Sequence, residues 1–109
     1  MNDIDFLLEE VMILFLPANH FAKYICDFCE RTKTDLIGLS EVTQIPKGYL
    51  MLYLKKGTTP QLVQFIKLAD GMSQIAKCSP QKMISRLYAA IKKDLRKEPF
   101  PPKERTLNE

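Results

Sequence analysis

The chain has 109 residues and a formal net charge of +3, with 46% hydrophobic and 27% charged residues. This composition is typical of a small folded domain and excludes an intrinsically disordered chain, and the length allows one hydrophobic core. Three cysteines, an odd number, favour free thiols in a reducing compartment. We therefore expect a cytoplasmic protein.

The charge is unevenly distributed along the chain. Residues 1–45 carry three Lys/Arg and eight Asp/Glu, whereas residues 46–109 carry thirteen Lys/Arg and five Asp/Glu. A basic half favours a polyanionic partner on that side of the molecule. The alternative is a solvated basic surface that binds no partner.

The first predicted element is an apolar helix over residues 4–16, in which ten of thirteen residues are apolar. Asn2 or Asp3 suits its N-cap, and Pro17 ends it. The run is too short to span a membrane and lacks the basic start of a signal peptide. A helix that is apolar nearly all round must be buried, so we expect it to pack in the domain and against a second subunit, giving a homodimer.

Five further helices, and no convincing strand, follow from the periodicity. The first covers about residues 19–31, with Phe21, Ile25 and Phe28 on one face. The second starts at Thr34 or Asp35 and ends near Thr43. The third covers residues 46–55, because proline suits the first turn of a helix and glycine its C-terminal stop; these are Pro46 and Gly57.

The next helix is predicted to begin at the Thr-Thr-Pro of residues 58–60, with four apolar residues directed inward: Leu62, Phe65, Ile66 and Ala69. A last helix opens at Ser79-Pro80, an N-cap followed by an N1 proline, and runs to about Lys97. Its apolar stripe comprises Met83, Ile84, Leu87, Tyr88, Ile91 and Leu95, and its basic stripe comprises Lys82, Arg86, Lys93 and Lys97. Residues 99–109 are predicted to form an extended, disordered tail.

The middle of the chain resembles the lambda-repressor-like (Xre/Cro-type) helix-turn-helix family of bacterial and phage regulators. LSEVTQI at 39–45 resembles the family's L-A-E-K-T-G-I, and IPKGYLMLYLKKGTTP at 45–60 is similar to its I-S-K-x-T-I-S-x-Y-L-N-G-x-x-x-P. LVQFIKLADGM at 62–72 resembles L-x-T-L-I-K-I-A-D-A-L. The resemblance implies an all-α helix-turn-helix domain over residues 18–76, flanked by the apolar helix of residues 1–17 and a basic C-terminal helix over 79–98.

The resemblance also implies which residues shape the domain. Leu39 falls at a buried leucine, and Ser40 falls where two helices cross closely. The apolar positions that hold the reading helix against the core are Ile45, Leu50, Tyr53 and Leu54. Gln44 replaces the glycine that usually closes the turn, so we expect the turn either to be made differently or to be under mild backbone strain. Lys56 stands at the family's glycine, so we expect the helix cap to move by one residue, to Gly57.

By the same resemblance, helix 46–55 enters the major groove of double-stranded DNA. The base-facing positions are Lys47, Gly48, Met51 and Leu52, and the positions that approach phosphate are Lys55, Lys56, Thr58 and Thr59. Lysine and threonine suit phosphate oxygens, while Met51 and Leu52 suit thymine methyl groups. Lys82 and Arg86 of the basic stripe would add contacts to the DNA phosphate backbone. The alternatives are that the stripe is an ordinary solvated face or lies on an anionic membrane.

A metal site is the main alternative reading of the cysteines. Cys26 and Cys29 have zinc-like spacing beside His20 and Cys78, but zinc ligands usually lie on turns, and this pair lies inside a predicted helix. We interpret them as small hydrophobic residues of the core. We found no catalytic constellation and expect no enzyme, cofactor or metal.

The sequence therefore predicts a small transcriptional regulator that binds an operator as a homodimer. We expect it not to bind a membrane. The alternative is a protein-interaction module of the same fold, an antirepressor or adaptor with little DNA affinity. In that case Tyr49, Met51 and Leu52 would form the binding surface.

Overall fold

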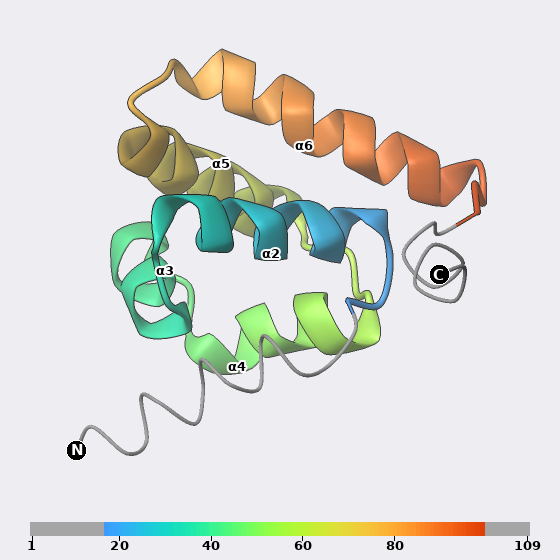
Figure 1. Ribbon diagram of the computed structural model, residues 1–109, viewed down its shortest axis with the longest axis horizontal. Coiled ribbons are helices and arrows are strands. Elements are labelled where there is room, and N and C mark those ends of the chain that lie inside the picture. The colour runs from blue at the N-terminus through green and yellow to red at the C-terminus, as the bar shows by residue number, and fades with distance from the viewer. Residues whose placement is uncertain (1–16, 100–109) are drawn as a thin grey trace, which may run out of the picture.

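The computed structural model describes residues 17–99, and this part of the chain is all-helical, as predicted. It contains five α-helices and a short π-helix, and no strand occurs between residues 17 and 99. The apolar helix predicted for residues 4–16 and nearly all of the predicted tail lie outside the described residues. Helix α2 lies in the middle of the molecule, with α6 on one side of it and α4 on the other (Figure 1).

Side chains satisfy the first three backbone N–H groups of helix α2 (His20–Thr32). Asn19 is its N-cap and accepts the N–H of Ala22 at 2.9 Å. The Asp94 carboxylate, from α6, accepts the N–H of His20 at 2.8 Å and that of Phe21 at 3.0 Å. No helix can satisfy these donors internally. Because Asp94 lies near the C-terminal end of the described chain, its bonds to His20 and Phe21 join the two ends of that chain.

Helix α3 (Leu36–Thr43) starts at Asp35, whose carboxylate accepts the N–H of Gly38 at 2.7 Å. Helix α4 (Lys47–Met51) begins after Pro46 and continues directly into the π-helix η1 (Leu52–Lys56). Together α4 and η1 cover the predicted helix 46–55 with a shift of one residue. Proline is the N-cap here instead of the first helical residue.

Helix α5 (Leu62–Ala76) begins later than predicted, and only two of the four residues expected to point inward, Phe65 and Ala69, pack in or against the core. Leu62 and Ile66, expected to point inward, are 73% and 45% exposed. The buried side chains are Leu68, Ala69, Met72 and Ser73. The cause is the close approach of α5 to α3, where a Cβ added to Gly71 would lie 2.6 Å from Thr43 Cγ2.

Helix α6 (Pro80–Leu95) starts as predicted, with Ser79 as N-cap and a proline in the first turn. It ends two residues before the predicted Lys97. Met83 and Leu87 of its apolar stripe are buried, whereas Tyr88 and Leu95 are 54% and 73% exposed. Ile84 and Ile91 are half-buried against the core, so four of the six stripe residues pack on the domain.

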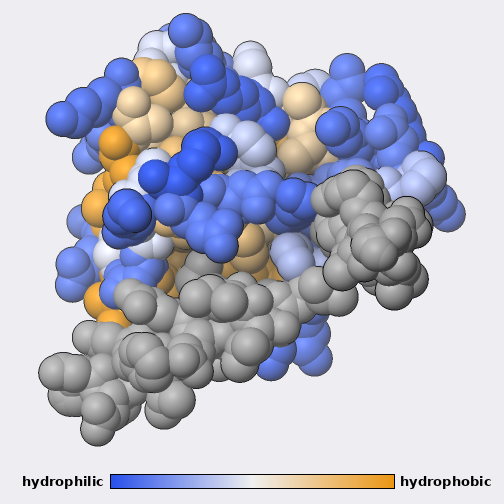
Figure 2. Space-filling view, in the orientation of Figure 1, coloured by the Kyte–Doolittle hydropathy of each residue, from blue (hydrophilic) through white to orange (hydrophobic). Residues whose placement is uncertain are grey.

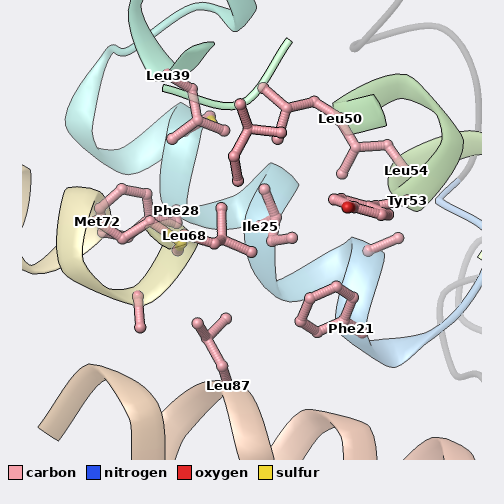
Figure 3. Close-up of a cluster of buried hydrophobic side chains, with 14 of the residues drawn as sticks. Phe21, Ile25, Phe28, Leu39, Leu50, Tyr53, Leu54, Leu68, Met72 and Leu87 are labelled. Atoms are coloured by element: carbon pink, nitrogen blue, oxygen red, sulfur yellow. The ribbon is translucent and has the colours of Figure 1, made fainter. Parts of the chain in front are cut away.

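All five α-helices and η1 contribute to one core around α2 (Figure 3). The predicted face of Phe21, Ile25 and Phe28 is buried at its centre. Leu87 reaches this cluster from α6, and Leu50 and Leu54 reach it from the opposite side (Figure 3). Burial of these aliphatic and aromatic side chains is the main force that holds α4 and α6 on opposite sides of α2.

The visible outer surface of α2 and α6 is mostly hydrophilic, with hydrophobic residues gathered near the left edge (Figure 2). Lys23 and Asp27 form an ion pair of 2.7 Å on α2. Within residues 17–99, none of the helices combines the length and the apolar character needed to cross a bilayer.

Candidate nucleic-acid interface

The inward side of α4 and η1 is anchored in the core by the residues that the resemblance implied. Leu50 and Leu54 have no exposed surface, and Tyr53 is 3% exposed. Tyr53 donates its hydroxyl hydrogen to the Gln64 side chain on α5. Ile45, just before the helix, is fully buried. The orientation of the helix about its own axis is therefore fixed by apolar burial on one side.

The helix ends at Lys56, and Gly57 is its C-cap. The last five residues, Leu52–Lys56, form the π-helix, which fits one extra residue into the final turn. Gly57 has φ 73° and ends the helix in the left-handed conformation, with its N–H bonded to the Leu52 carbonyl. The predicted cap at Gly57 is confirmed, and the π-helical turn lies directly before it.

The start of α2 holds this end of the helix in place. Ala18 donates its N–H to the Leu54 carbonyl at 3.1 Å, and the Asn19 amide donates to the Gly57 carbonyl at 3.1 Å. A Cβ at Gly57 would lie 2.8 Å from Asn19 Nδ2, so the two segments are in close contact. The C-terminal end of η1 is thus fixed to the centre of the fold.

The turn between α3 and α4 fixes the other end. Gln44 adopts the left-handed conformation with φ 62°, which is the strained alternative of the two expected for a non-glycine residue there. The Ser40 hydroxyl donates to the Ile45 carbonyl at 2.6 Å. The Thr43 hydroxyl accepts the N–H of Ile45 at 3.3 Å. Two hydroxyl side chains therefore satisfy backbone groups where the chain changes direction.

The outward side of α4 and η1 carries the predicted contact residues. Lys47, Gly48, Lys55 and Lys56 are exposed, Leu52 is 40% exposed, and Met51 is half-buried. Thr58 and Thr59 are exposed just beyond the helix. No carboxylate of the described part of the chain forms an ion pair with these lysines. Their positive charges are therefore not neutralised by ion pairs within residues 17–99.

This surface also lies in the longest acid-free part of the sequence. Between Glu41 and Asp70 the chain contains four lysines and no Asp or Glu. Local positive charge of this kind attracts polyanions over a distance set by the ionic strength.

A hollow of about 250 Å³ lies between η1 and the start of α5. Its lining combines aromatic rings, hydroxyl groups and side-chain amides, from Tyr49, Leu52, Tyr53, Thr58, Thr59, Pro60, Gln61 and Gln64. The sequence analysis missed the two glutamines. Side-chain amides are common partners of phosphates and base edges. Only the position of these glutamines next to Thr58 and Thr59 could have indicated them.

The two remaining predicted contact residues lie elsewhere. Lys82 and Arg86 are exposed on α6, which packs on α2 and α5. This helix lies on the opposite side of α2 from α4 (Figure 1). The structure therefore does not bring the basic stripe of α6 together with the lysines of α4 and η1.

The three cysteines form no disulfide, and two of them lie inside α2. Cys29 is buried and Cys26 is half-buried. Burial raises the pKa of the Cys26 thiol to about 11 and that of Cys29 to about 12. A neutral, buried thiol is a poor nucleophile and a poor metal ligand. Residues 17–99 contain no group of three or more His, Cys, Asp or Glu placed to hold a metal ion.

Comparisons with known proteins returned nothing: no protein-family model, no curated protein and no solved structure matches the chain.

Proposed function

We propose that the protein is a small DNA-binding transcriptional regulator in which α3 and α4–η1 form a helix-turn-helix unit. The observation that supports this most strongly is the two-sided character of the helix from Lys47 to Lys56. Its inward side is locked in the core, and its outward side carries exposed lysines without a carboxylate partner among residues 17–99. A rigid helix with a basic outer side is what insertion into a major groove requires.

In this proposal the exposed side divides into two groups of contacts. Lys47 donates to base edges, while Gly48 allows close approach and Leu52 contacts thymine methyl groups. Lys55, Lys56 and the hydroxyl groups of Thr58 and Thr59 contact phosphates. Gln61 joins this second group because it lines the same hollow as the threonines. Lys82 and Arg86 are left out of the contact because α6 lies beyond α2 from this surface.

Binding as a homodimer is part of the proposal. Leu62 and Val63 are 73% and 66% exposed on α5, which leaves apolar surface that a second copy would cover. Two copies related by a two-fold axis would contact half-sites about 34 Å apart, one helical turn of DNA.

A second candidate is a protein-interaction module, and one observation favours it. Tyr49 is 49% exposed beside Leu52, and both line the hollow next to η1. An aromatic and an aliphatic side chain at a concave surface are typical anchors for a protein partner.

The salt dependence of binding separates the two candidates. Fluorescence anisotropy with random-sequence duplex DNA would be measured from 50 to 200 mM salt, followed by selection of bound fragments from the source genome. Contact with several phosphates gives a steep linear fall of log K against log salt, with a slope of about −0.9 per phosphate. A flat salt response together with no enriched fragment would overturn the regulator proposal and leave the interaction module.

A further inference from the structure

The outward side of α4 and η1 carries apolar residues among its lysines. Leu52 is 40% exposed near the middle of this side, and Met51 is half-buried beside it. Lys47, Lys55 and Lys56 surround them. Two adjacent apolar side chains bordered by lysines form a surface that fits an occupant of mixed apolar and acidic character.

The described chain starts beside this surface. The Ala18 N–H is bonded to the Leu54 carbonyl at 3.1 Å, and a Cβ at Gly57 would lie 3.2 Å from Ala18 Cβ. Residue 17 therefore adjoins the C-terminal end of the same helix that carries Met51 and Leu52. The sixteen residues before it are tethered within reach of the exposed side.

The composition of those sixteen residues complements the surface. Residues 4–16 are apolar at ten of thirteen positions, and residues 1–16 contain four carboxylates and no Lys or Arg. As a helix, thirteen residues span about 20 Å, and the ten residues from Lys47 to Lys56 span about 15 Å. The predicted helix is therefore long enough to cover α4 and η1, and its carboxylates are opposite in charge to the exposed lysines.

We propose that residues 4–16 dock along the outward side of α4 and η1 of the same chain. Their apolar side chains cover Met51 and Leu52, and Asp5, Glu9 and Glu10 approach the surrounding lysines. Because the segment covers the residues assigned to DNA, it competes with DNA for this surface. The docking stands on its own evidence, whereas the competition rests on the proposed function.

Photo-crosslinking in the full chain tests the docking without DNA. Leu52 is replaced by p-benzoylphenylalanine, and the matched control carries the same residue at Tyr88, which is 54% exposed on α6, across α2 from this surface. After irradiation, the joined peptides are mapped by mass spectrometry. The proposal predicts a cross-link from position 52 to residues 4–16 of the same chain, and none to that segment from position 88.

Mixing isotopically heavy and light chains before irradiation identifies the occupant. Cross-links that join heavy to light chains would mean that a second copy covers the surface, which contradicts docking within one chain. No cross-link to residues 4–16 from position 52, or equal yields from positions 52 and 88, would also overturn the inference. None of these results bears on whether the protein binds DNA.

The competition is tested with four charge-neutral substitutions spread round the predicted N-terminal helix: Leu7→Ser, Leu8→Ser, Met12→Ser and Ile13→Ser. If the docked arrangement holds about nine-tenths of the molecules, releasing it raises the apparent DNA affinity about tenfold. Loss of the cross-link with unchanged DNA affinity would refute the competition. A cross-link in a protein that binds no DNA at any salt would leave the docking intact and refute the proposed function.

Discussion

The side-chain amide of Asn19 donates to the carbonyl of Gly57 at 3.1 Å, and this bond joins the start of α2 to the end of η1. The same amide group accepts the N–H of Ala22 through its oxygen, at 2.9 Å. One residue therefore caps the central helix and holds the helix that carries the candidate interface. Asparagine is suited to both tasks because it is a donor and an acceptor.

Substitutions of Asn19 separate these two roles. Asn19→Ala removes both bonds and should lower the free energy of unfolding by about 1–3 kcal/mol. Asn19→Asp keeps the cap acceptor and adds a charge that favours a helix N-terminus, so its loss should be smaller. Urea denaturation measures both values. Equal losses for the two variants would show that the bond to Gly57 and the cap do not act as described.

The close contact between α3 and α5 at Gly71 predicts a strongly position-dependent effect of adding one methyl group. A Cβ at Gly71 would lie 2.6 Å from Thr43 Cγ2 and 2.9 Å from Thr43 Cα. Because the backbone itself must move, Gly71→Ala should destabilise the protein by about 1–3 kcal/mol. Gly48→Ala is the matched control, since nothing lies within 4 Å of its added Cβ. That variant should gain up to about 1 kcal/mol from helix propensity. Thermal unfolding that ranks the two variants in the reverse order would contradict the packing of α3 on α5.

The strain at Gln44 predicts a stabilising substitution. Gln44 has φ 62°, a conformation that costs a residue with a Cβ about 1–2 kcal/mol. Gln44→Gly removes that cost but adds freedom to the unfolded chain, so we expect a net gain of about 0.5–1 kcal/mol. Gln44→Ala keeps the strain and serves as the comparison. The prediction is wrong if calorimetry finds the glycine variant no more stable than the alanine variant.

The buried thiols predict a loss of stability at alkaline pH. The ordinary thiol pKa is 9.0, and folding raises it to about 11 for Cys26 and to about 12 for Cys29, chiefly because burial disfavours the thiolate. The folded state therefore holds these protons more tightly than the unfolded state. Their contribution to stability is complete below pH 9 and is lost as pH rises through 11 and 12.

Alkylation of individual cysteines checks this prediction. At pH 8 the native protein should react with iodoacetamide far more slowly at Cys26 and Cys29 than the urea-unfolded chain does, because only the thiolate attacks. Peptide mapping reports each site separately. Equal rates in the native and unfolded states would mean that the interior of α2 is accessible.

Much of the fold could be predicted from short-range patterns. Ser79-Pro80 started α6 as expected, Gly57 ended η1, and Asp35 capped α3, because caps and turn residues act within a few positions. The buried face of Phe21, Ile25 and Phe28 also followed from spacing alone. These features depend on local chemistry that a sequence displays directly.

The orientation of α5 could not be predicted in the same way. Apolar residues occur all along 62–69, so their spacing fits more than one buried face. Leu68 and Met72 are buried, and Leu62 and Ile66 exposed, because Gly71 has no side chain and allows α3 to pack closely against that side of α5. That contact joins residues 28 positions apart, and spacing within one helix carries no information about it.

The candidate interface could be predicted only in part, because it also depends on packing between distant segments. Lys47, Lys55 and Lys56 share an exposed side because helical spacing determines it. Lys82 and Arg86 were grouped with them by charge alone, but the packing of α6 on α2 and α5 separates the two sets. The π-helical turn was not predicted, and the only feature of the sequence that could have indicated it is the position of Gly57 directly after Lys56.

The most direct test of the account compares two charge-reversed double variants of the full chain in duplex DNA binding. Lys55→Glu with Lys56→Glu should lower the affinity by at least about tenfold and reduce the salt slope by about 2, because in the proposed complex each lysine contacts a phosphate. Lys82→Glu with Arg86→Glu makes the same change in net charge on the far side of α2 and should have a much smaller effect. If the two double variants weaken binding equally, or if only the α6 variant does, the outward side of α4 and η1 is not the DNA-binding surface.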